Sequence, residues 1–354
     1  MYLDELHCHG FRCLADLHFT PARGVNFIRG RNAQGKTSLL ECILFAATSK
    51  SHRTSLETDL AARGGEGFRI ALHVVRADRE VTLEVNWWQG DKRVKVNGVA
   101  QSRMSDTLGK VRVVLFSPED IALVKGSAST RRKFLDMALS QLSPVYLAAL
   151  QQYRQVLRQR NELLRASQPD GRQLDAWDQQ LIKHGRILIQ EREAFIEELG
   201  NFAAQAYRAI AREEELRLRY LPDTPARDLE KALQEARPSD LRRKQTSHGP
   251  HRDEIEFVIA DKPARSHASQ GQQKSAALAV KLAELELVRE RTGEYPILML
   301  DEVLAELDAA RGEHMFDAIN EEVQCLLTTT DLHDQNGARG AANFIIENGT
   351  LSRL

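Results

Sequence analysis

Hydrophobic and polar positions alternate along much of the first 125 residues. Residues 68–76, 80–87 and 92–96 place apolar and polar side chains in turn, which is the pattern of strands in an antiparallel meander. Asn97-Gly98 follows the last of these segments and signals a tight turn. Apolar runs indicate further strands at residues 2–9, 16–19, 25–29 and 111–116. We therefore expect this part of the chain to be rich in β-structure.

The period changes after residue 125, where apolar residues recur at helical spacing. Ser143-Pro144 has the residue types of a helix start, and a Pro-Asp-Gly run at residues 169–171 ends that helix. A second helix follows, with apolar residues at steps of three, four and seven from Leu174 onwards, and we expect it to end at residues 221–225. The two helices predict either a projecting antiparallel arm or an ordinary helical subdomain with the same apolar stripe.

The last third of the chain returns to mixed patterns. A charged helix (228–236) and a basic loop (242–244) precede an expected hairpin formed by residues 254–259 and 264–269. Alternating helices and strands are then expected at residues 272–291, 296–300, 309–320, 323–327 and 344–351. These changes predict three segments, at residues 1–125, 126–245 and 246–354.

The clearest chemistry lies at residues 30–37, which read Gly-Arg-Asn-Ala-Gln-Gly-Lys-Thr and match G-x-x-x-x-G-K-[ST] at every fixed position. An apolar strand precedes the match and a helix with an apolar face follows it, as the motif requires. The glycines let backbone N–H groups point at phosphate oxygens, Lys36 is expected to reach the outer phosphates, and Thr37 is expected to hold Mg²⁺. The predicted nucleotide-binding residues are Gly30, Arg31, Asn32, Ala33, Gln34, Gly35, Lys36, Thr37 and Ser38.

A second nucleotide motif lies far along the chain, where four apolar residues at 297–300 run into Asp301 and Glu302. A buried strand of this kind brings its terminal carboxylates next to the phosphate loop. We expect Asp301 to bind Mg²⁺ together with Thr37, directly or through water, and Glu302 to act as the catalytic residue that polarises the attacking water.

Two further motifs indicate an ABC-type ATPase. Ser269, Gln270, Gly271 and Gln272 precede a helix and are similar to the ABC signature, in which a serine and a helix N-terminus receive the ATP held by another subunit. Residues 305–308, which include Glu306 and Asp308, are similar to the D-loop. We therefore predict an α/β fold, an ABC-type P-loop ATPase head with a mixed β-sheet around the loop and an inserted α-helical lobe, and an ATP-dependent homodimer.

Composition restricts the class and location of the protein but indicates no additional binding site. The chain has 354 residues and a formal net charge of -1, so a nucleic-acid surface would have to be local. It begins without an apolar leader and holds no apolar run of membrane length, which predicts a cytoplasmic protein without a membrane span. His7, Cys8, His9 and Cys13 are not expected to share a metal, because successive residues of a strand face opposite sides.

Several longer stretches resemble the RecF family of bacterial recombination mediators. They are Leu39-Leu40-Glu41, Pro118-Glu119-Asp120, Lys125-Gly126, residues 131–136 and, most specifically, Gly-Pro-His-Arg-Asp at residues 249–253. The resemblance extends over nearly the whole chain. It implies an ATP-dependent DNA-binding protein that dimerises on ATP, hydrolyses ATP slowly, loads recombinase at gaps with RecR and RecO, and supports DNA repair, replication and the SOS response.

A DNA surface is suggested by residues 125–165, which hold eight basic and two acidic side chains. Arg154, Arg158 and Arg165 fall on one helical face and could follow a phosphate backbone with little sequence preference. The same row is also compatible with an ordinary solvated helix face. The predicted DNA-binding residues, with single-stranded, duplex or gapped DNA as partner, are Arg131, Arg132, Lys133, Arg154, Arg158 and Arg165.

Other classes of P-loop protein make different demands on the sequence. An SMC-type head needs hundreds of coiled-coil residues between its nucleotide motifs, and the helical segment at residues 130–215 is far shorter. A transporter ATPase would have its motifs closer together and no basic lobe, and a P-loop kinase would ignore DNA. A GTPase would need Asn-Lys-x-Asp, which the chain lacks. ABC heads often place a histidine after the strand that follows the D-loop; His333 lies farther on, so the γ-phosphate sensor stays open.

Overall fold

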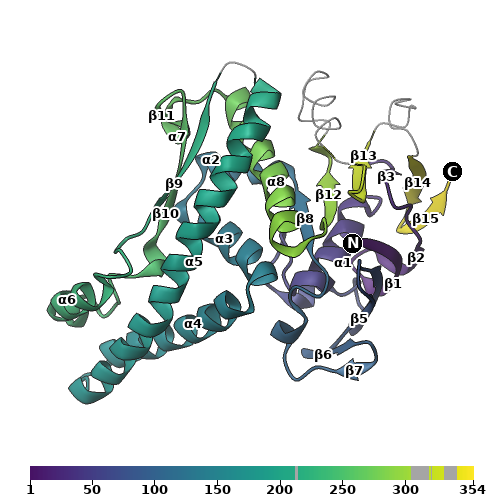
Figure 1. The fold of residues 1–354 in the computed structure, drawn as a ribbon. Helices are drawn as coiled ribbons and strands as arrows, with labels where there is room; N and C mark the ends of the chain where they lie inside the picture. The colour runs from purple at the N-terminus through teal and green to yellow at the C-terminus, as the bar shows by residue number, and fades with distance from the viewer. Residues whose placement is uncertain (212–213, 304–318, 320, 331–340) are drawn as a thin grey trace. The chain divides into compact units, whose positions relative to one another are not determined.

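The computed structural model describes residues 1–211, 214–303, 319, 321–330 and 341–354 (Figure 1). The chain divides into two compact units. The first holds Met1–Asp120, Ala209–Arg212 and Ala277–Leu354, and the second holds Ile121–Arg208 and Glu213–Ala276. The first part of the predicted C-terminal segment thus lies with the helical unit, because its strand β10 pairs with β9 of that unit.

An antiparallel sheet of six strands makes up one layer of the first unit. Its order is β2 (Leu14–Phe19), β1 (Tyr2–Phe11), β4 (Gly67–Val75), β5 (Glu80–Trp88), β6 (Asp91–Val96) and β7 (Val99–Ala100). Buried and open positions alternate along β4 and β5, which confirms the predicted meander. Asn97 and Gly98 have φ of 50° and 79°, as a type I′ hairpin turn requires.

A second sheet of six strands, mostly parallel, carries the nucleotide motifs. Its order is β15 (Thr350–Arg353), β14 (Ala342–Glu347), β3 (Val25–Arg29), β13 (Cys325–Thr329), β12 (Ile297–Asp301) and β8 (Val113–Phe116). Every pairing is parallel except that of β14 with β15. The predicted mixed sheet around the phosphate loop is confirmed.

Helix α1 (Lys36–Thr48) packs against strands of both sheets and is buried at every residue except Thr37. Its Phe45 meets Phe68 of the antiparallel sheet edge to face at 5.6 Å, and Phe68 stacks on Trp87. Ile28, Leu326 and Met299 of the parallel sheet belong to the same core cluster. The helix therefore anchors the loop before it to a rigid core.

The second unit is mainly helical. It contains α2 (Ala122–Lys125), α3 (Ala128–Leu142), α4 (Pro144–Arg165), most of α5 (Gly171–Ala211), α6 (Leu229–Arg243) and α7 (Ala264–His267), with a sheet of β11 (Lys262–Pro263), β10 (Glu254–Ile259) and β9 (Leu216–Leu221). Helix α8 (Gln270–Thr292) begins here and continues into the first unit. Of the short 3-10 turns, Glu57–Leu60 and Met104–Thr107 belong to the first unit, Pro118–Ile121 lies where the chain passes to the second, and Pro250–Arg252 belongs to the second.

The predicted start of α4 is confirmed, since the Ser143 hydroxyl accepts a hydrogen bond from the Tyr146 N–H at 3.1 Å. Helices α4 and α5 lie side by side in Figure 1 and bury most of the predicted apolar stripe. The buried members of the stripe are Tyr146, Leu150, Tyr153, Leu164, Leu174, Leu181, Leu188 and Phe195.

Three expectations for the second unit were wrong. Residues 216–221 form β9 rather than the end of the long helix, and the alternation Leu-Arg-Leu-Arg-Tyr-Leu is the overlooked signal. Residues 264–267 form the short helix α7, and the returning strand is only β11 (Lys262–Pro263), which pairs with the end of β10 on the side opposite β9. Helix α6 continues through Pro238 to Arg243, so Arg242 and Arg243 lie in its last turn rather than in a loop.

Candidate nucleotide site

The phosphate loop joins β3 to α1 and is shaped by two glycines. A Cβ on Gly30 would lie 2.5 Å from the Ile346 carbonyl oxygen, so no side chain fits there. Gly35 is the N-cap of α1 with φ of 116°, a conformation that favours glycine. Gln34 ties the loop to the turn before β15, because its side-chain oxygen accepts from the Asn348 N–H at 2.6 Å and its carbonyl accepts from the Gly349 N–H.

Lys36 is held inside the loop and is 3% exposed. Its Nζ donates to the Gly30 carbonyl at 2.8 Å and to the Arg31 carbonyl at 3.0 Å, and lies 3.1 Å from Oε1 of Glu302. Arg31, Asn32 and Ala33 are exposed, while Gln34 and Thr37 are half-buried and Ser38 is buried. Residues 31–33 of the predicted loop are therefore exposed, while the ammonium group of Lys36 is held in place by loop carbonyls.

The carboxylate of Asp301 lies directly beside the loop. The Thr37 hydroxyl donates to its Oδ1 at 3.1 Å, and the Thr328 hydroxyl donates to the same oxygen at 2.7 Å. Strand β13, which carries Thr328, lies between β12 and β3 and pairs with both in parallel. Burial raises the pKa of Asp301, and the hydrogen bonds from Thr328 and Thr37 oppose that shift. Two hard oxygen donors at this spacing suit Mg²⁺.

Glu302 leaves the strand in a left-handed conformation, with φ of 52°. Its backbone N–H donates to the Thr328 hydroxyl at 2.9 Å, and its side chain is 38% exposed. A non-glycine residue in this region is uncommon and is often found at functional sites. The turn directs the carboxylate away from the strand and toward Lys36.

Two contributors to this site were not predicted. Thr328 links Asp301 to Glu302, and its position at the end of an apolar strand parallel to β12 is the signal that could have found it. His52 follows helix α1, and its Nδ1 is buried without a hydrogen-bond partner among the described residues. Burial lowers the pKa of His52, and the charges of Glu41 and Asp301 oppose that shift. No pattern in the sequence indicates that His52 lies near Glu41 and Asp301.

The signature residues lie at the start of α8. The Ser269 N–H donates to the Gln272 side chain at 2.6 Å and the Gln272 N–H donates to the Ser269 hydroxyl at 3.2 Å, which is a capping box. Ser269 and Gln270 are exposed, and Gly271 is half-buried. The helix N-terminus is thus open at its surface. Glu306 and Asp308 of the expected D-loop, and His333, lie outside the described residues.

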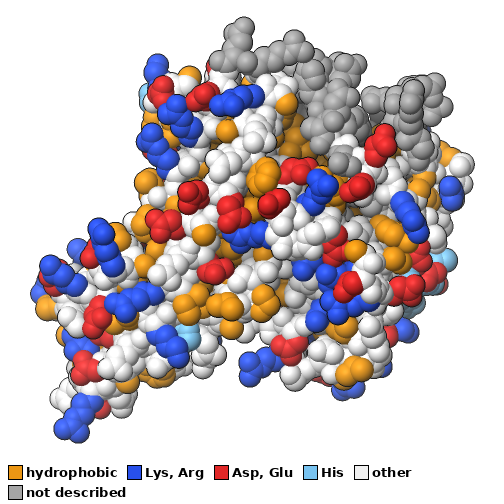
Figure 2. All heavy atoms as spheres, viewed as in Figure 1, with side chains coloured by type: hydrophobic (Ala, Val, Ile, Leu, Met, Phe, Trp, Pro, Cys, Tyr) orange, Lys and Arg blue, Asp and Glu red, His pale blue; other side chains and the backbone are white. Residues whose placement is uncertain are grey.

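The predicted DNA-binding residues differ in how accessible they are. Lys133, Arg154, Arg158 and Arg165 are exposed, and Arg132 is half-buried with its guanidinium donating to the Asp253 carbonyl. Arg154 also pairs with Asp136 at 2.6 Å. Figure 2 shows basic side chains interspersed with acidic ones over the part of the second unit that holds α4–α6.

Arg131 requires a correction. It is 2% exposed, pairs with Glu254 at 2.5 Å, and donates to the carbonyls of Leu123 and Gly126. Its charge is used inside the unit, so it is not available to DNA.

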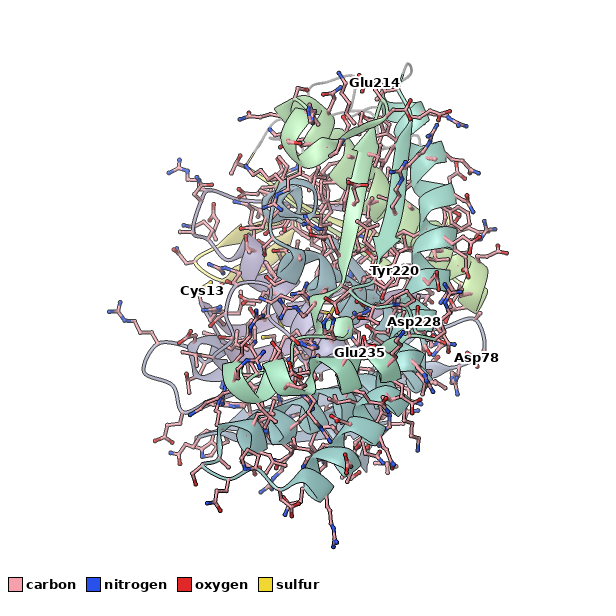
Figure 3. The ribbon with its side chains drawn as sticks, turned by 90° about the vertical axis from the view of Figure 1, so that its left-hand side faces the viewer. Cys13, Asp78, Glu214, Tyr220, Asp228 and Glu235 are labelled. Atoms are coloured by element: carbon pink, nitrogen blue, oxygen red, sulfur yellow. The ribbon has the colours of Figure 1, made fainter. Side chains whose placement is uncertain are left out.

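The Gly-Pro-His-Arg-Asp run forms a buried network rather than an open site. Asp253 is fully buried; it accepts from Arg192 at 2.7 Å and from the hydroxyl of Tyr220, whose place is marked in Figure 3. Arg192 donates as well to the Pro250 carbonyl at 2.6 Å. The network ties the run to α5 and β9.

His251, in the same run, is held as a neutral imidazole. Its Nε2 faces the Thr246 carbonyl, which can only accept, and its Nδ1 faces the Tyr153 hydroxyl at 2.7 Å. Burial lowers the pKa of His251 to about 4. A Cβ on Gly249 would lie 2.5 Å from the same hydroxyl, and its φ of 129° also favours glycine. His251 therefore has a structural role within the second unit.

Comparison with known proteins places this site in a family. A model for the AAA domain matches residues 5–235. The DNA replication and repair protein RecF of Limosilactobacillus reuteri (strain DSM 20016) is 41% identical over 374 residues, covering 100% of this chain and 99% of the relative. The RecF of Pediococcus pentosaceus is 41% identical over 347 residues, covering 94% and 93%.

Solved structures agree with the sequence relatives. The structure of the recombination mediator protein RecF with ATP has a TM-score of 0.93 and 34% identity, and covers 100% of this chain and 97% of that one. An Smc head bound to a domain of ScpA has a TM-score of 0.60 at 16% identity, covers 100% of this chain and 98% of that one, and shows only that the fold is shared. The phosphate loop, the Asp301–Thr328 pair and this similarity over full length agree, and the chain belongs to the RecF family of DNA replication and repair proteins.

Proposed function

We propose that this chain is an ATP-dependent DNA-binding protein of recombinational repair and replication, whose ATP-bound dimer closes on DNA and whose slow hydrolysis of ATP opens it. The named function of its relatives and the ATP complex of a RecF support this assignment. In the same proposal the protein acts in the cytoplasm with RecR and RecO, helps to load recombinase at gaps and supports the SOS response. Among the described residues, no helix has the length and apolarity that crossing a bilayer demands.

The side chains of the first unit suit a nucleotide triphosphate with Mg²⁺. Lys36 and the backbone N–H groups of residues 31–37 hold the phosphates, since the lysine is fixed by two loop carbonyls. Thr37 and Asp301 hold the metal through neighbouring oxygens. Mg²⁺, when bound, neutralises charge on the phosphate oxygens.

The observation that carries the proposal is the chain of contacts from Thr37 through Asp301 and Thr328 to Glu302. Thr328 contacts both acidic residues: its hydroxyl donates to the carboxylate of Asp301 and accepts from the backbone N–H of Glu302. The arrangement separates their roles, because Asp301 lies beside the threonine ligand while Glu302 turns out of the strand. Glu302 is the residue that orients the attacking water and accepts its proton, giving a weak, DNA-dependent ATPase.

A second copy of the chain is proposed to complete the site with Ser269 and the following residues. Ser269 and Gln270 are exposed at the start of a 23-residue helix, where backbone N–H groups favour an anion. The DNA surface is proposed to include Arg132, Lys133, Arg154, Arg158 and Arg165.

Glu302→Gln tests the clamp. The amide keeps the size of the side chain and removes the base, so hydrolysis should fall by about 100-fold or more while ATP binding persists. Light scattering of this variant in ATP and Mg²⁺ should show a long-lived dimer, and Lys36→Met should stay monomeric. A monomeric Glu302→Gln protein at saturating ATP contradicts the clamp, even if nucleotide binding is intact.

A further inference from the structure

Strands β1 and β2 place three potential metal ligands on the open face of the antiparallel sheet. His7 pairs directly with His18 in the β1–β2 register, and Glu5 precedes His7 by two residues, so all three point to the same face. Both histidines are exposed, whereas Cys8 is buried on the opposite face. Alternation along β1 therefore places Glu5 and His7 on the open face, and the pairing of β1 with β2 places His18 beside them.

The three side chains converge at one point. Nε2 of His7 lies 3.1 Å from Oε1 of Glu5, and Nε2 of His18 lies 2.7 Å from the same oxygen. Their ligand atoms all lie within 4.8 Å of one another. The two imidazole rings stack with centroids 4.3 Å apart and planes 13° apart.

We propose that Glu5, His7 and His18 form a binding site for a divalent first-row transition ion, with Zn²⁺ as the expected metal. Two imidazoles and one carboxylate are among the protein ligand sets that zinc takes, with water or another group completing four-coordination. Ligand atoms about 2.0–2.1 Å from a tetrahedral zinc are about 3.3 Å apart. The Glu5 oxygen is already 3.1 Å from Nε2 of His7, and its 2.7 Å separation from Nε2 of His18 would lengthen on binding.

Binding needs a modest rearrangement that the site permits. A metal lies in the plane of each imidazole ring, whereas the two rings are now nearly parallel, so at least one must turn about its Cβ–Cγ bond. The His7 and His18 side chains are 58% and 56% exposed, so neighbouring atoms leave room for that turn. Mg²⁺ prefers oxygen ligands and six-coordination, so the ions required for ATP are poor competitors here.

The arrangement has little value as an ordinary surface contact. Exposed ion pairs contribute little to stability, so the contacts of His7 and His18 with Glu5 are not needed to hold the sheet together. None of the three side chains takes part in the nucleotide site described above. A shared cation would give each of the three its own coordination position.

Titration calorimetry of the full-length, nucleotide-free protein with ZnCl₂, in millimolar Mg²⁺, tests the site. The background is Cys13→Ser, because Cys13 is an exposed thiol that can bind zinc by itself. One zinc per chain is expected. His7→Ala and His18→Ala should each weaken that binding by at least about tenfold, since loss of even an outer-shell partner of a metal ligand has this effect.

His9→Ala is the matched control. His9 lies on the same strand and face, is 74% exposed, and faces Asp16 at 3.9 Å instead of the cluster. The His9→Ala variant should bind zinc with the same affinity as the background protein. Zinc should also raise the unfolding temperature of the background protein and not that of a His7→Ala/His18→Ala double variant. Absence of zinc binding, or binding that His7→Ala and His18→Ala leave unchanged, overturns the proposal.

Discussion

The phosphate loop of the first unit and the Arg192–Asp253 network of the second unit both contain buried ionic groups, but they differ in how their charges are matched. Arg192 and Asp253 are paired at 2.7 Å, and each makes additional hydrogen bonds to fixed groups of other elements. Lys36 instead meets two loop carbonyls and the side chain of Glu302, which is partly exposed and leaves its strand in a left-handed conformation.

This difference shows where each unit uses its charged residues. A closed network stabilises a fold, because the loss of one partner leaves the other charged, buried and unmatched. The nucleotide site instead combines the cation of Lys36 with the carboxylates of Asp301 and Glu302, for which we propose phosphate, Mg²⁺ and water as partners. Charge-removing substitutions should therefore affect stability in the second unit and ligand binding in the first.

Arg192→Met should produce the largest effect. It leaves Asp253 buried without its cation, and breaking a buried pair costs about 3–5 kcal/mol of unfolding free energy. Urea unfolding monitored by circular dichroism measures the loss. Arg158→Met, on the exposed face of α4 with a side chain 70% exposed, is the control and should change stability by less than about 0.5 kcal/mol. If the two variants lost equal unfolding free energy, the buried Arg192–Asp253 network would be no more important for stability than an exposed surface arginine.

Lys36→Met should act on nucleotide affinity. Hydrogen bonds to a charged group are worth about 1.5–3 kcal/mol each, so loss of the lysine should weaken ATP binding by about 100-fold or more. Calorimetry with a non-hydrolysable ATP analogue measures the change. The urea midpoint should move much less than in Arg192→Met. A variant that binds ATP normally would show that the loop lysine has no part in binding.

Acid should destabilise the second unit through His251. Burial lowers its pKa to about 4, below the value of about 6.5 expected in the unfolded chain, so the native state binds fewer protons. Its contribution is complete above pH 6.5 and is lost as the pH falls toward 4, at most about 3 kcal/mol. His251→Gln, which keeps a donor and an acceptor but does not titrate, should show a flatter decline in unfolding free energy between pH 6.5 and 4. Parallel pH profiles of the two proteins would contradict this account.

The DNA surface should give the smallest effect per residue. Arg158→Ala combined with Arg165→Ala should reduce the slope of log affinity against log salt by about 2, because each phosphate contact contributes about 1. Fluorescence anisotropy on duplex, single-stranded and gapped DNA measures the slope. Arg93→Ala, at a side chain 82% exposed on β6, is the control. An unchanged slope would place the DNA elsewhere on the protein.

Much of the fold and the centre of the site could be predicted from local patterns. The phosphate loop is readable because its glycines and lysine are consecutive, and the meander strands because one buried face imposes alternation on sequence. Strand β9 was missed because the long helix before it was extended through residues 216–221, although apolar and polar residues alternate within β9. Arg131 could not be separated from its exposed neighbours, since its burial depends on Glu254, more than a hundred residues away.

The sequence by itself determined the class of chemistry, because a phosphate loop needs particular residue types at consecutive positions and any chain that has them carries the signal locally. Only the tertiary structure decided which charges serve ligands and which serve the fold. Asp301, Thr328 and Thr37 come from three separate segments, and parallel pairing of strands brings them within hydrogen-bond distance. His7 and His18 meet through strand register in the same way. Partners of this kind are set by pairing and burial, which no short stretch of residues encodes alone.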